Sequence, residues 1–419
     1  MKKLFSILVL GLLFSGNAYA GTCKTPKNPK EKFVLAPEPV SYTRKSPTNR
    51  IEEVLSNRKT INVFRAYNNH FGNIKNYGLV WAGTAPFPND KMFSVAEVYW
   101  NYAYPNTSWH RDRFPGDGDK FLTNRNWGHN KEYGKTVAVN IKHPEYLSYT
   151  EQRIKSRTYA KDGVLFDWWH NRHKHAGGYS EKTVKRFRTA LAKQTREKFG
   201  KDFLIIGNVN WDKDTGTHKY LNGAWMELYK KNERLGGYDC GQIKLIGELL
   251  KFHDQNLQEP RLVAFEPWKI SKVPPKNVME KLEMKKFGVK ISNDQYKKFF
   301  NISRKKYWKA HYRSSPENIK FAKLFTAMAM VIPENGYILY GDNNPDEPTH
   351  DHLHEFYDFY NTDLGKETSI GMEITEGLGF KMYEKGVIVY NYTKKRYKIE
   401  FTNQKEVTID PLEGMFVEF

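Results

Sequence analysis

Eight short apolar runs recur between residues 61 and 341 and limit the folds open to this chain. An apolar run without alternation suits a strand covered on both faces, as in a parallel sheet flanked by helices. The runs are residues 61–67, 79–84, 93–102, 163–168, 203–208, 223–229, 262–268 and 336–341. Strands that alternate with helical stretches predict an α/β architecture, and eight strands are the number that a (β/α)8 TIM barrel needs.

Several stretches between these runs carry helix signals. Residues 144–156, 180–200 and 242–253 have apolar side chains at helical intervals, and Gly200 suits the end of the second of these helices. Ser315-Pro316-Glu317 places an N-cap, a proline and an acid at the start of a helix that runs through residue 329. The connection 105–136 is too long for an ordinary βα loop, and we expect it to build one wall of a cleft.

The N-terminus has the three parts of a secretory signal peptide in residues 1–20. Two lysines are followed by an apolar core at residues 4–14 and by the cleavage pattern Ala18-Tyr19-Ala20. The alternative is lipidation at Cys23, but Thr22 stands where lipoprotein processing usually needs Gly, Ala or Ser. The apolar core is too short to span a bilayer, and no later run could do so. We therefore expect a periplasmic or extracellular protein.

Composition divides the rest of the chain into three parts. Residues 21–50 are rich in Lys, Pro, Thr and Ser without periodicity, which indicates a linker or a wrapping arm. Residues 51–366 would hold the barrel. Residues 367–419 contain short β-type runs separated by turn residues, so we expect a small antiparallel β domain at the end.

Cys23 and Cys240 are the only cysteines, and either one disulfide or two free thiols would fit an exported chain. Lys and Arg outnumber Asp and Glu by 67 to 47, which gives a formal charge of +20. This charge could attract an acidic polysaccharide, nucleic acid or an envelope surface. Because the basic residues are spread along the chain, we slightly favour an ordinary solvated surface. No nucleic-acid-binding motif is present, and we expect a monomer.

Residues 162–171 read Asp-Gly-Val-Leu-Phe-Asp-Trp-Trp-His-Asn. Asp162-Gly163 is a turn signal, and the apolar residues 164–166 form a short strand. The run ends on Asp167, which in a TIM barrel would lie at the C-terminal mouth, where barrel enzymes keep their chemistry. A carboxylate beside rings that can stack on a sugar suits a catalytic site. On this segment alone, an Asp that caps the next helix or pairs with a cation fits equally well.

Polar side chains also interrupt or end the other late runs. Such groups are costly inside an apolar strand unless they are paired or face a cleft. They are Glu97, Asn208, Asn210, Glu227, Glu266 and Asp342. Several carboxylates at one end of a barrel suit glycoside hydrolysis, which needs two carboxyl groups flanking the scissile bond, one of them able to donate a proton.

Asp167 and Glu227 are the pair that we predict to be catalytic. Asp167 would attack the anomeric carbon or stabilise its positive charge, and Glu227 would protonate the leaving oxygen. Glu266 is the reserve acid/base, although a salt bridge would explain it as well. We predict substrate-binding roles for Trp168, Asn208, Asn210, Trp211, Tyr229, Glu266, Trp268 and Asp342. Each tryptophan could instead pack in the core. The reaction needs no cofactor.

The order of several segments resembles a known family. The first is the run from Thr136 to Asp167, with His143-Pro144-Glu145-Tyr146, a helix containing Arg153-Ile154, and Asp162-Gly163-x-x-x-Asp167. Residues 205–208, 222–227, 356–360, 363–366 and 386–391 follow in the same order. Together they resemble glycosyl hydrolase-like family 15 and, more distantly, the dextranase and endo-galactosaminidase barrels. The resemblance spans residues 61–419 and implies Asp167 as nucleophile and Glu227 as acid/base. Trp168-Trp169 stands where the family often has a second acid or Asn, so the subsite differs.

Three other readings compete with a secreted hydrolase of a polysaccharide or glycan. A metal-dependent hydrolase could use one of two histidine clusters, although neither has an established spacing such as H-E-x-x-H. The clusters are His170, His173 and His175, and His350, Asp351, His352 and His354. A catalytically inactive carbohydrate-binding or envelope protein could share the fold. A polyanion-binding protein would be retained on heparin or DNA in a strongly salt-dependent way.

Overall fold

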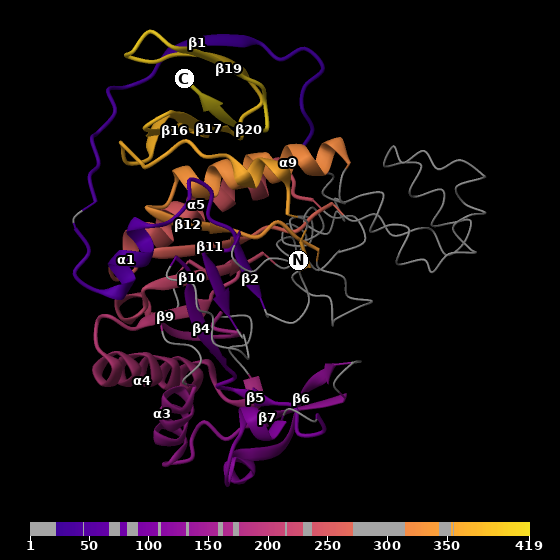
Figure 1. The fold of residues 1–419 in the computed structure, drawn as a ribbon. Helices are drawn as coiled ribbons and strands as arrows, with labels where there is room; N and C mark the ends of the chain where they lie inside the picture. Colours follow the sequence, from indigo (N-terminus) through magenta and orange to yellow (C-terminus); the bar gives the residue numbers. More distant parts are fainter. Residues whose placement is uncertain are drawn as a thin grey trace, which may run out of the picture.

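Eight parallel strands form a closed barrel in the computed structural model (Figure 1). The structure describes residues 22–44, 46–66, 76–81, 91–107, 110–130, 134–157, 162–170, 176–213, 216–228, 237–270, 315–342, 353–354 and 356–419. In order round the barrel, the strands are β2 (Phe64–Ala66), β3 (Leu79–Trp81), β4 (Phe93–Val98), β8 (Gly163–Phe166), β9 (Leu204–Asn208), β10 (Gly223–Glu227), β11 (Leu262–Glu266) and β12 (Asn335–Ile338). A parallel bridge between Val63 and Ile338 closes the ring. The predicted (β/α)8 barrel is confirmed.

Inward-facing side chains fill the barrel in alternation along each strand. Phe64, Trp81, Phe93, Leu165 and Ile206 belong to this inner cluster, with further members from β10, β11 and β12. Helix α1 (Arg50–Ser56) adds Ile51, Val54 and Leu55 to the same cluster. Because α1 contacts the residues that begin β4 and β8, it covers the N-terminal end of the barrel.

The helices that were predicted from spacing and caps are present outside the barrel. They are α3 (Tyr146–Ser156), α4 (Glu181–Phe199), α5 (Cys240–Asn256) and α9 (Pro316–Val331). The Ser180 side chain accepts a bond from the Thr183 N–H at the start of α4, and Ser315 does the same for Asn318 at the start of α9. Gly200 ends α4 with a φ of 76°, a conformation that favours glycine.

The long connection after β4 forms a small sheet of its own. Strands β5 (Tyr102–Ala103), β6 (Leu122–Asn130) and β7 (Gly134–Val139) are antiparallel, in the order β5-β7-β6. A short helix α2 (His110–Arg113) and the 3-10 turns η2 (Gly118–Phe121) and η4 (Ala176–Gly178) lie close to it in the chain or in space. In Figure 1 this sheet lies at the opposite side of the barrel from the C-terminal strands.

The C-terminal part consists of two small sheets packed face to face. The first contains β15 (Met372–Thr375), β16 (Leu378–Tyr383), β17 (Gly386–Asn391) and β20 (Glu413–Glu418), all antiparallel. The second contains β18 (Arg396–Glu400) and β19 (Glu406–Ile409). Phe380, Val389, Ile399 and Ile409 are among the residues buried between them. Helix α9 separates these sheets from the barrel (Figure 1).

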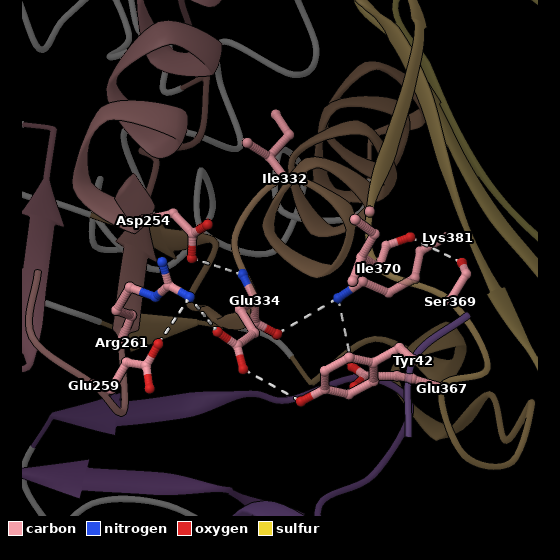
Figure 2. Close-up of a pocket in the computed structure, with 11 residues that line it drawn as sticks. Tyr42, Asp254, Glu259, Arg261, Ile332, Glu334, Glu367, Ser369, Ile370 and Lys381 are labelled. Atoms are coloured by element: carbon pink, nitrogen blue, oxygen red, sulfur yellow. Dashed lines mark hydrogen bonds and ion pairs between the residues drawn. The ribbon is translucent and has the colours of Figure 1, made fainter. Parts of the chain in front are cut away.

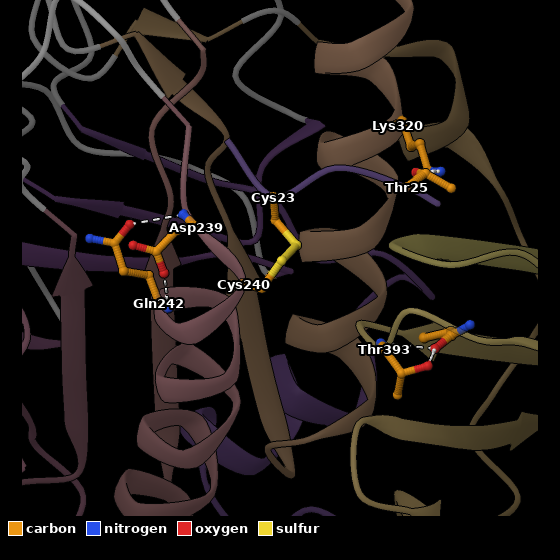
Figure 3. The surroundings of a disulfide bond; sticks show 8 residues. Cys23, Thr25, Asp239, Cys240, Gln242, Lys320 and Thr393 are labelled. Carbon is orange, nitrogen blue, oxygen red and sulfur yellow. Dashed lines mark hydrogen bonds between the residues drawn. A yellow bond between two sulfur atoms is a disulfide. The ribbon is translucent and has the colours of Figure 1, made fainter. Parts of the chain in front are cut away.

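The N-terminal arm is attached to helix α5 and to the C-terminal sheets rather than hanging free. A disulfide joins Cys23 to Cys240, the first residue of α5, which decides between the two cysteine states left open by the sequence (Figure 3). The arm then adds β1 (Glu31–Leu35) to the second C-terminal sheet, parallel to β18. Among the described residues, no helix has the length and apolar character needed to cross a membrane. The predicted signal peptide lies outside them.

Candidate active site

The alternation that fills the barrel with apolar residues continues into a ring of polar side chains. Val95, Leu165, Ile206, Trp225 and Ala264 all face inward. The residue two positions further along each strand faces the same way, since side chains alternate along a strand. Those residues are Glu97, Asp167, Asn208, Glu227 and Glu266. They stand together at the C-terminal mouth, where TIM-barrel enzymes place their reacting groups.

Hydrogen bonds from Tyr102, Trp168 and Asn208 hold Asp167 in place. The Tyr102 hydroxyl donates to Oδ2 at 2.8 Å. The Trp168 main-chain N–H donates to Oδ1 at 2.8 Å, and Asn208 Nδ2 donates to the same oxygen at 2.9 Å. Only 8% of Asp167 is exposed. Bonds to the charged form of a carboxylate stabilise it against protonation, so this arrangement suits an ionised nucleophile and not a helix cap.

Asn208 joins the two predicted catalytic carboxylates. Its Nδ2 donates to Asp167 Oδ1 at 2.9 Å and to Glu227 Oε2 at 2.8 Å. The amide is 1% exposed, so its position is fixed by packing as well as by these bonds. Asp167 directly follows β8, Glu227 ends β10, and Asn208 ends β9, the strand between them. The structure therefore brings the predicted pair together across one strand.

Glu227 and Glu266 are register partners on neighbouring strands but differ in exposure. Glu266 is fully buried, and Trp225 Nε1 donates to its Oε2 at 2.9 Å. Glu227 is partly exposed. A proton donor must reach the substrate, so the more exposed Glu227 is the better placed of the two. Glu97, in turn, forms an ion pair with Arg113 at 3.4 Å.

Two residues at the mouth have left-handed backbone conformations that residues other than glycine rarely adopt. Trp168 and Asn210 both have a φ of 53°. Asn tolerates this region, whereas a bulky Trp is strained there by order 1–3 kcal/mol. The Trp168 ring lies 5.2 Å from the Tyr102 ring and the Trp168 N–H contacts Asp167. Strain of this kind gathers at functional sites, and here it lies beside the predicted nucleophile.

The remaining predicted substrate-binding residues differ in their exposure, and not all of them are described by the structure. Trp211 is partly exposed, with its ring edge-on to Tyr238 at 5.8 Å. Trp268 is 4% exposed, and its main-chain N–H donates to the Tyr238 hydroxyl. Tyr229 lies outside the described residues. The backbone of Asp342 ends β13 (Gly341–Asp342), but its side chain is not among those described.

The histidine clusters fall largely outside the described residues. His173, His175, His350 and His352 lie beyond them, and only the backbone of His354 is described. His170 is buried, with its ring stacked near Trp168. Within the described ranges, no group of three or more His, Cys, Asp or Glu side chains is arranged to hold a metal ion.

Sequence reasoning did not identify Trp100 and Tyr102. Trp100 Nε1 donates to the Asp167 carbonyl at 2.7 Å, and the Tyr102 hydroxyl donates to its carboxylate. Burial and the nearby Asp167 raise the pKa of Tyr102 well above its ordinary value, so its hydroxyl stays a donor. The four aromatic residues within 99–104 could have indicated a functional segment, but residues 99–102 were included in the predicted strand 93–102.

A pocket of about 350 Å³ lies at the N-terminal end of the barrel strands (Figure 2). Arg261 and Glu334, which precede β11 and β12, pair across it at 3.0 Å, and the Tyr42 hydroxyl donates to Glu334 at 3.2 Å. Its charged groups are largely paired with one another, and TIM-barrel chemistry does not occur at this end. We therefore assign the pocket a structural role.

Comparison with known proteins gives structural similarity alone. No protein-family model matches the chain, and no curated protein does. Solved structures that resemble it include the glycoside hydrolase domain of PelA from Pseudomonas aeruginosa, at 10% identity and TM-score 0.36 over 49% of this chain and 83% of that one. Aspergillus fumigatus Ega3 in complex with galactosamine matches at 12% and 0.35, over 57% and 89%. Eubacterium rectale Amy13B matches at 10% and 0.44, over 85% and 92%. The resemblance to glycosyl hydrolase-like family 15 stays a hypothesis.

Proposed function

We propose that the chain is a glycoside hydrolase that cleaves a polysaccharide or glycan with Asp167 and Glu227. The observation that carries this proposal is the pair of carboxylates joined by Asn208 at the barrel mouth. Two carboxyl groups that face one space, one buried and bonded and the other partly exposed, match the needs of a nucleophile and a proton donor. The other predicted side chains at the mouth, with Asn210, Trp168 and Trp211 among them, would contact the sugar.

The spacing of the two carboxylates favours a retaining reaction. The two bonds from Asn208 allow at most about 5.7 Å between the bonded oxygens, whereas retaining enzymes have roughly 5–5.5 Å between carboxyls and inverting enzymes about 6.5–9.5 Å. In the first step an Asp167 oxygen bonds to the anomeric carbon while the glycosidic bond breaks and Glu227 gives its proton to the leaving oxygen. Water then attacks, Glu227 accepts its proton, and Asp167 leaves.

Export of the chain is part of the proposal. Residues 1–20 would be removed, residues 21–50 would form the arm, residues 51–366 the catalytic barrel and residues 367–419 the C-terminal domain. The disulfide between Cys23 and Cys240 supports an oxidising compartment, where such bonds persist. In this scheme the protein acts outside the cytoplasm on a neutral or an acidic glycan, and we propose that it does so as a monomer.

The decisive test is sugar release from a panel of neutral and acidic polysaccharides by the wild type and by Asp167→Asn. We expect release that the substitution reduces by at least about 10³-fold, because removing a nucleophile removes the covalent route. Nuclear magnetic resonance of the first product should show retained anomeric configuration. Release that survives Asp167→Asn would exclude Asp167 as nucleophile, and no release from any polysaccharide would favour a binding protein.

A further inference from the structure

Asp167 is held on one side by a single stretch of chain, residues 99–104. The Trp100 indole donates to the Asp167 carbonyl at 2.7 Å, and two residues later the Tyr102 hydroxyl donates to Asp167 Oδ2 at 2.8 Å. One segment therefore fixes both the main chain and the carboxylate of this residue. The other carboxylate oxygen, Oδ1, is bonded from the opposite side by Trp168 N and Asn208.

Tyr102 is itself firmly placed. It lies on β5, where it is the register partner of Ala138 on β7, so the inserted sheet carries it. Its ring packs against those of Tyr99 at 4.8 Å and Trp168 at 5.2 Å, and only 2% of the residue is exposed. From helix α3, the Tyr146 hydroxyl donates to the Trp100 carbonyl at 2.8 Å, which holds the preceding turn of chain.

We infer that Tyr102 is a positioning residue for Asp167, and that the inserted sheet belongs to the catalytic apparatus because it delivers this hydroxyl. The inference rests on the proposed function. Tyr102 keeps its proton throughout the reaction and transfers none. It fixes the plane of the carboxylate before attack, and it stabilises the negative charge that returns to Asp167 when water displaces it from the sugar.

Several other ionisable groups lie near Tyr102 and Asp167. Glu97 and its partner Arg113 lie on the β4 side, and Glu227 is reached through Asn208. Tyr99 and Tyr104 complete the aromatic cluster around Tyr102. A test of Tyr102 must leave all of these unchanged, which calls for removal of one oxygen atom and nothing else.

The test compares Tyr102→Phe with Tyr149→Phe in the full chain. Both tyrosines are buried and both substitutions remove a hydroxyl hydrogen bond, but the Tyr149 hydroxyl donates to the Pro115 carbonyl and not to the carboxylate. We expect Tyr102→Phe to lower kcat by roughly 10- to 100-fold with little change in KM, since a misplaced reacting group costs that order. The acid limb of the kcat/KM profile should move to higher pH, because the charged carboxylate loses a donor. Tyr149→Phe should leave that limb in place.

A second variant tests the same role in case Tyr102→Phe folds poorly. Replacement of Tyr102 by 3,5-difluorotyrosine keeps the shape and strengthens the donor, so the acid limb should move to lower pH, opposite to the Phe variant. Wild-type activity that Asp167→Asn abolishes, combined with an unmoved limb in both Tyr102 variants, would overturn this role and leave the proposed function standing. A wild type that releases no sugar would overturn both.

Discussion

Asn208 is the residue on which the geometry of the site depends most. Its amide nitrogen has two hydrogens, and each is directed at one of the two proposed catalytic carboxylates. The amide oxygen has no hydrogen-bond partner among the described residues, although it is buried. Asn208 therefore sets the separation of the two carboxylates.

Replacing this amide with a carboxylate should remove activity without a change in fold. In Asn208→Asp, three carboxylates would share one space, no N–H would remain between them, and the charged forms would oppose one another. We expect kcat/KM to fall by at least about 100-fold, measured on the polysaccharide that the wild type cleaves. Circular dichroism should show the native spectrum. Activity within about threefold of wild type would show that the bridge has no catalytic importance.

Asn210 allows its side chain to be tested apart from its backbone. Asn and Gly both tolerate a φ of 53°, so Asn210→Gly should change the free energy of unfolding by less than about 1 kcal/mol. If the buried amide binds substrate as predicted, KM should rise while the unfolding temperature holds. Gln404→Gly is the matched control, because Gln404 has a φ of 65° in an exposed turn. An unchanged KM in Asn210→Gly would remove Asn210 from the substrate-binding residues.

At the scale of elements, α1 shows how the barrel is closed at the end away from the site. Arg50 Nε contacts Asp162 Oδ1 at 2.6 Å, and the Ser94 N–H donates to Oδ2 at 2.8 Å. One buried carboxylate thus ties α1 to the starts of β4 and β8. Sequence reasoning took Asp162 only as half of a turn signal.

Loss of Arg50 should lower stability and leave catalysis alone. In Arg50→Met the buried Asp162 loses its cation, which we expect to cost about 1–3 kcal/mol of unfolding free energy, less than a fully buried pair because Arg50 is partly exposed. Urea unfolding would measure it. Lys120→Met breaks exposed ion pairs with Asp117 and Glu145 and should not change the midpoint. A fall in kcat per folded molecule of Arg50→Met would contradict the view that the N-terminal end of the barrel contributes to stability and not to catalysis.

The sequence predicted the elements whose signals are local. Apolar runs without alternation identified all eight barrel strands, and Ser180 and Ser315 marked helix starts, because burial on both faces and capping are read within a few residues. Asp167, Asn208 and Glu227 could be predicted as residues of the barrel mouth because each is a polar side chain that ends or interrupts an apolar run. The pairing of β1 with β18 could not, since it joins segments more than 350 residues apart. Tyr102 was missed because its contact with Asp167 depends on how the chain turns after β4, which no local sequence signal predicts.

At the scale of the whole molecule, the N-terminal arm is attached near both of its ends, by the disulfide at Cys23 and by the ion pair between Arg44 and Glu367. The disulfide spans 217 residues and ties Cys23 to the start of α5, whose N-terminus is also capped by Asp239 and Gln242 (Figure 3). Between the fastenings, Lys320 of α9 donates to Thr25, and β1 pairs with β18. The arm thus connects the barrel helices with the C-terminal sheets.

Removal of the disulfide should destabilise the whole chain. A cross-link that closes so long a loop restricts the unfolded state, and its loss typically costs about 2–5 kcal/mol. The double variant Cys23→Ser with Cys240→Ser should therefore show a lower urea midpoint and unchanged kcat at low temperature. Thr25→Ala, which removes one exposed contact of the same segment, is the control and should match the wild type. A double variant as stable as wild type would show that the disulfide is not needed to hold the arm in place.

Glu367 joins the arm, the barrel and the C-terminal domain through one carboxylate. It forms ion pairs with Arg44 of the arm, Arg58 after α1, and Lys381 of β16. Figure 2 shows Lys381 and Glu367 lining the pocket at the N-terminal end of the barrel strands. Burial alone would raise the pKa of Glu367, but Arg58, Lys381 and Arg44 outweigh it and lower the pKa to about 2.

This depressed pKa predicts acid sensitivity with a definite direction. The unfolded chain binds the Glu367 proton near pH 4.5 and the folded chain only near pH 2, so the pairing stabilises the fold fully above about pH 5 and is lost as the pH falls towards 2. The stabilisation at neutral pH is roughly 3 kcal/mol. Glu367→Gln should therefore be less stable than wild type at pH 7 in urea, and the difference should shrink steadily between pH 5 and pH 2. Glu406→Gln, which removes an exposed pair with Lys398, should show no such convergence. A stability difference between Glu367→Gln and wild type that is constant over this range would mean that the three cations do not depend on the charge of Glu367 to hold the parts of the molecule together.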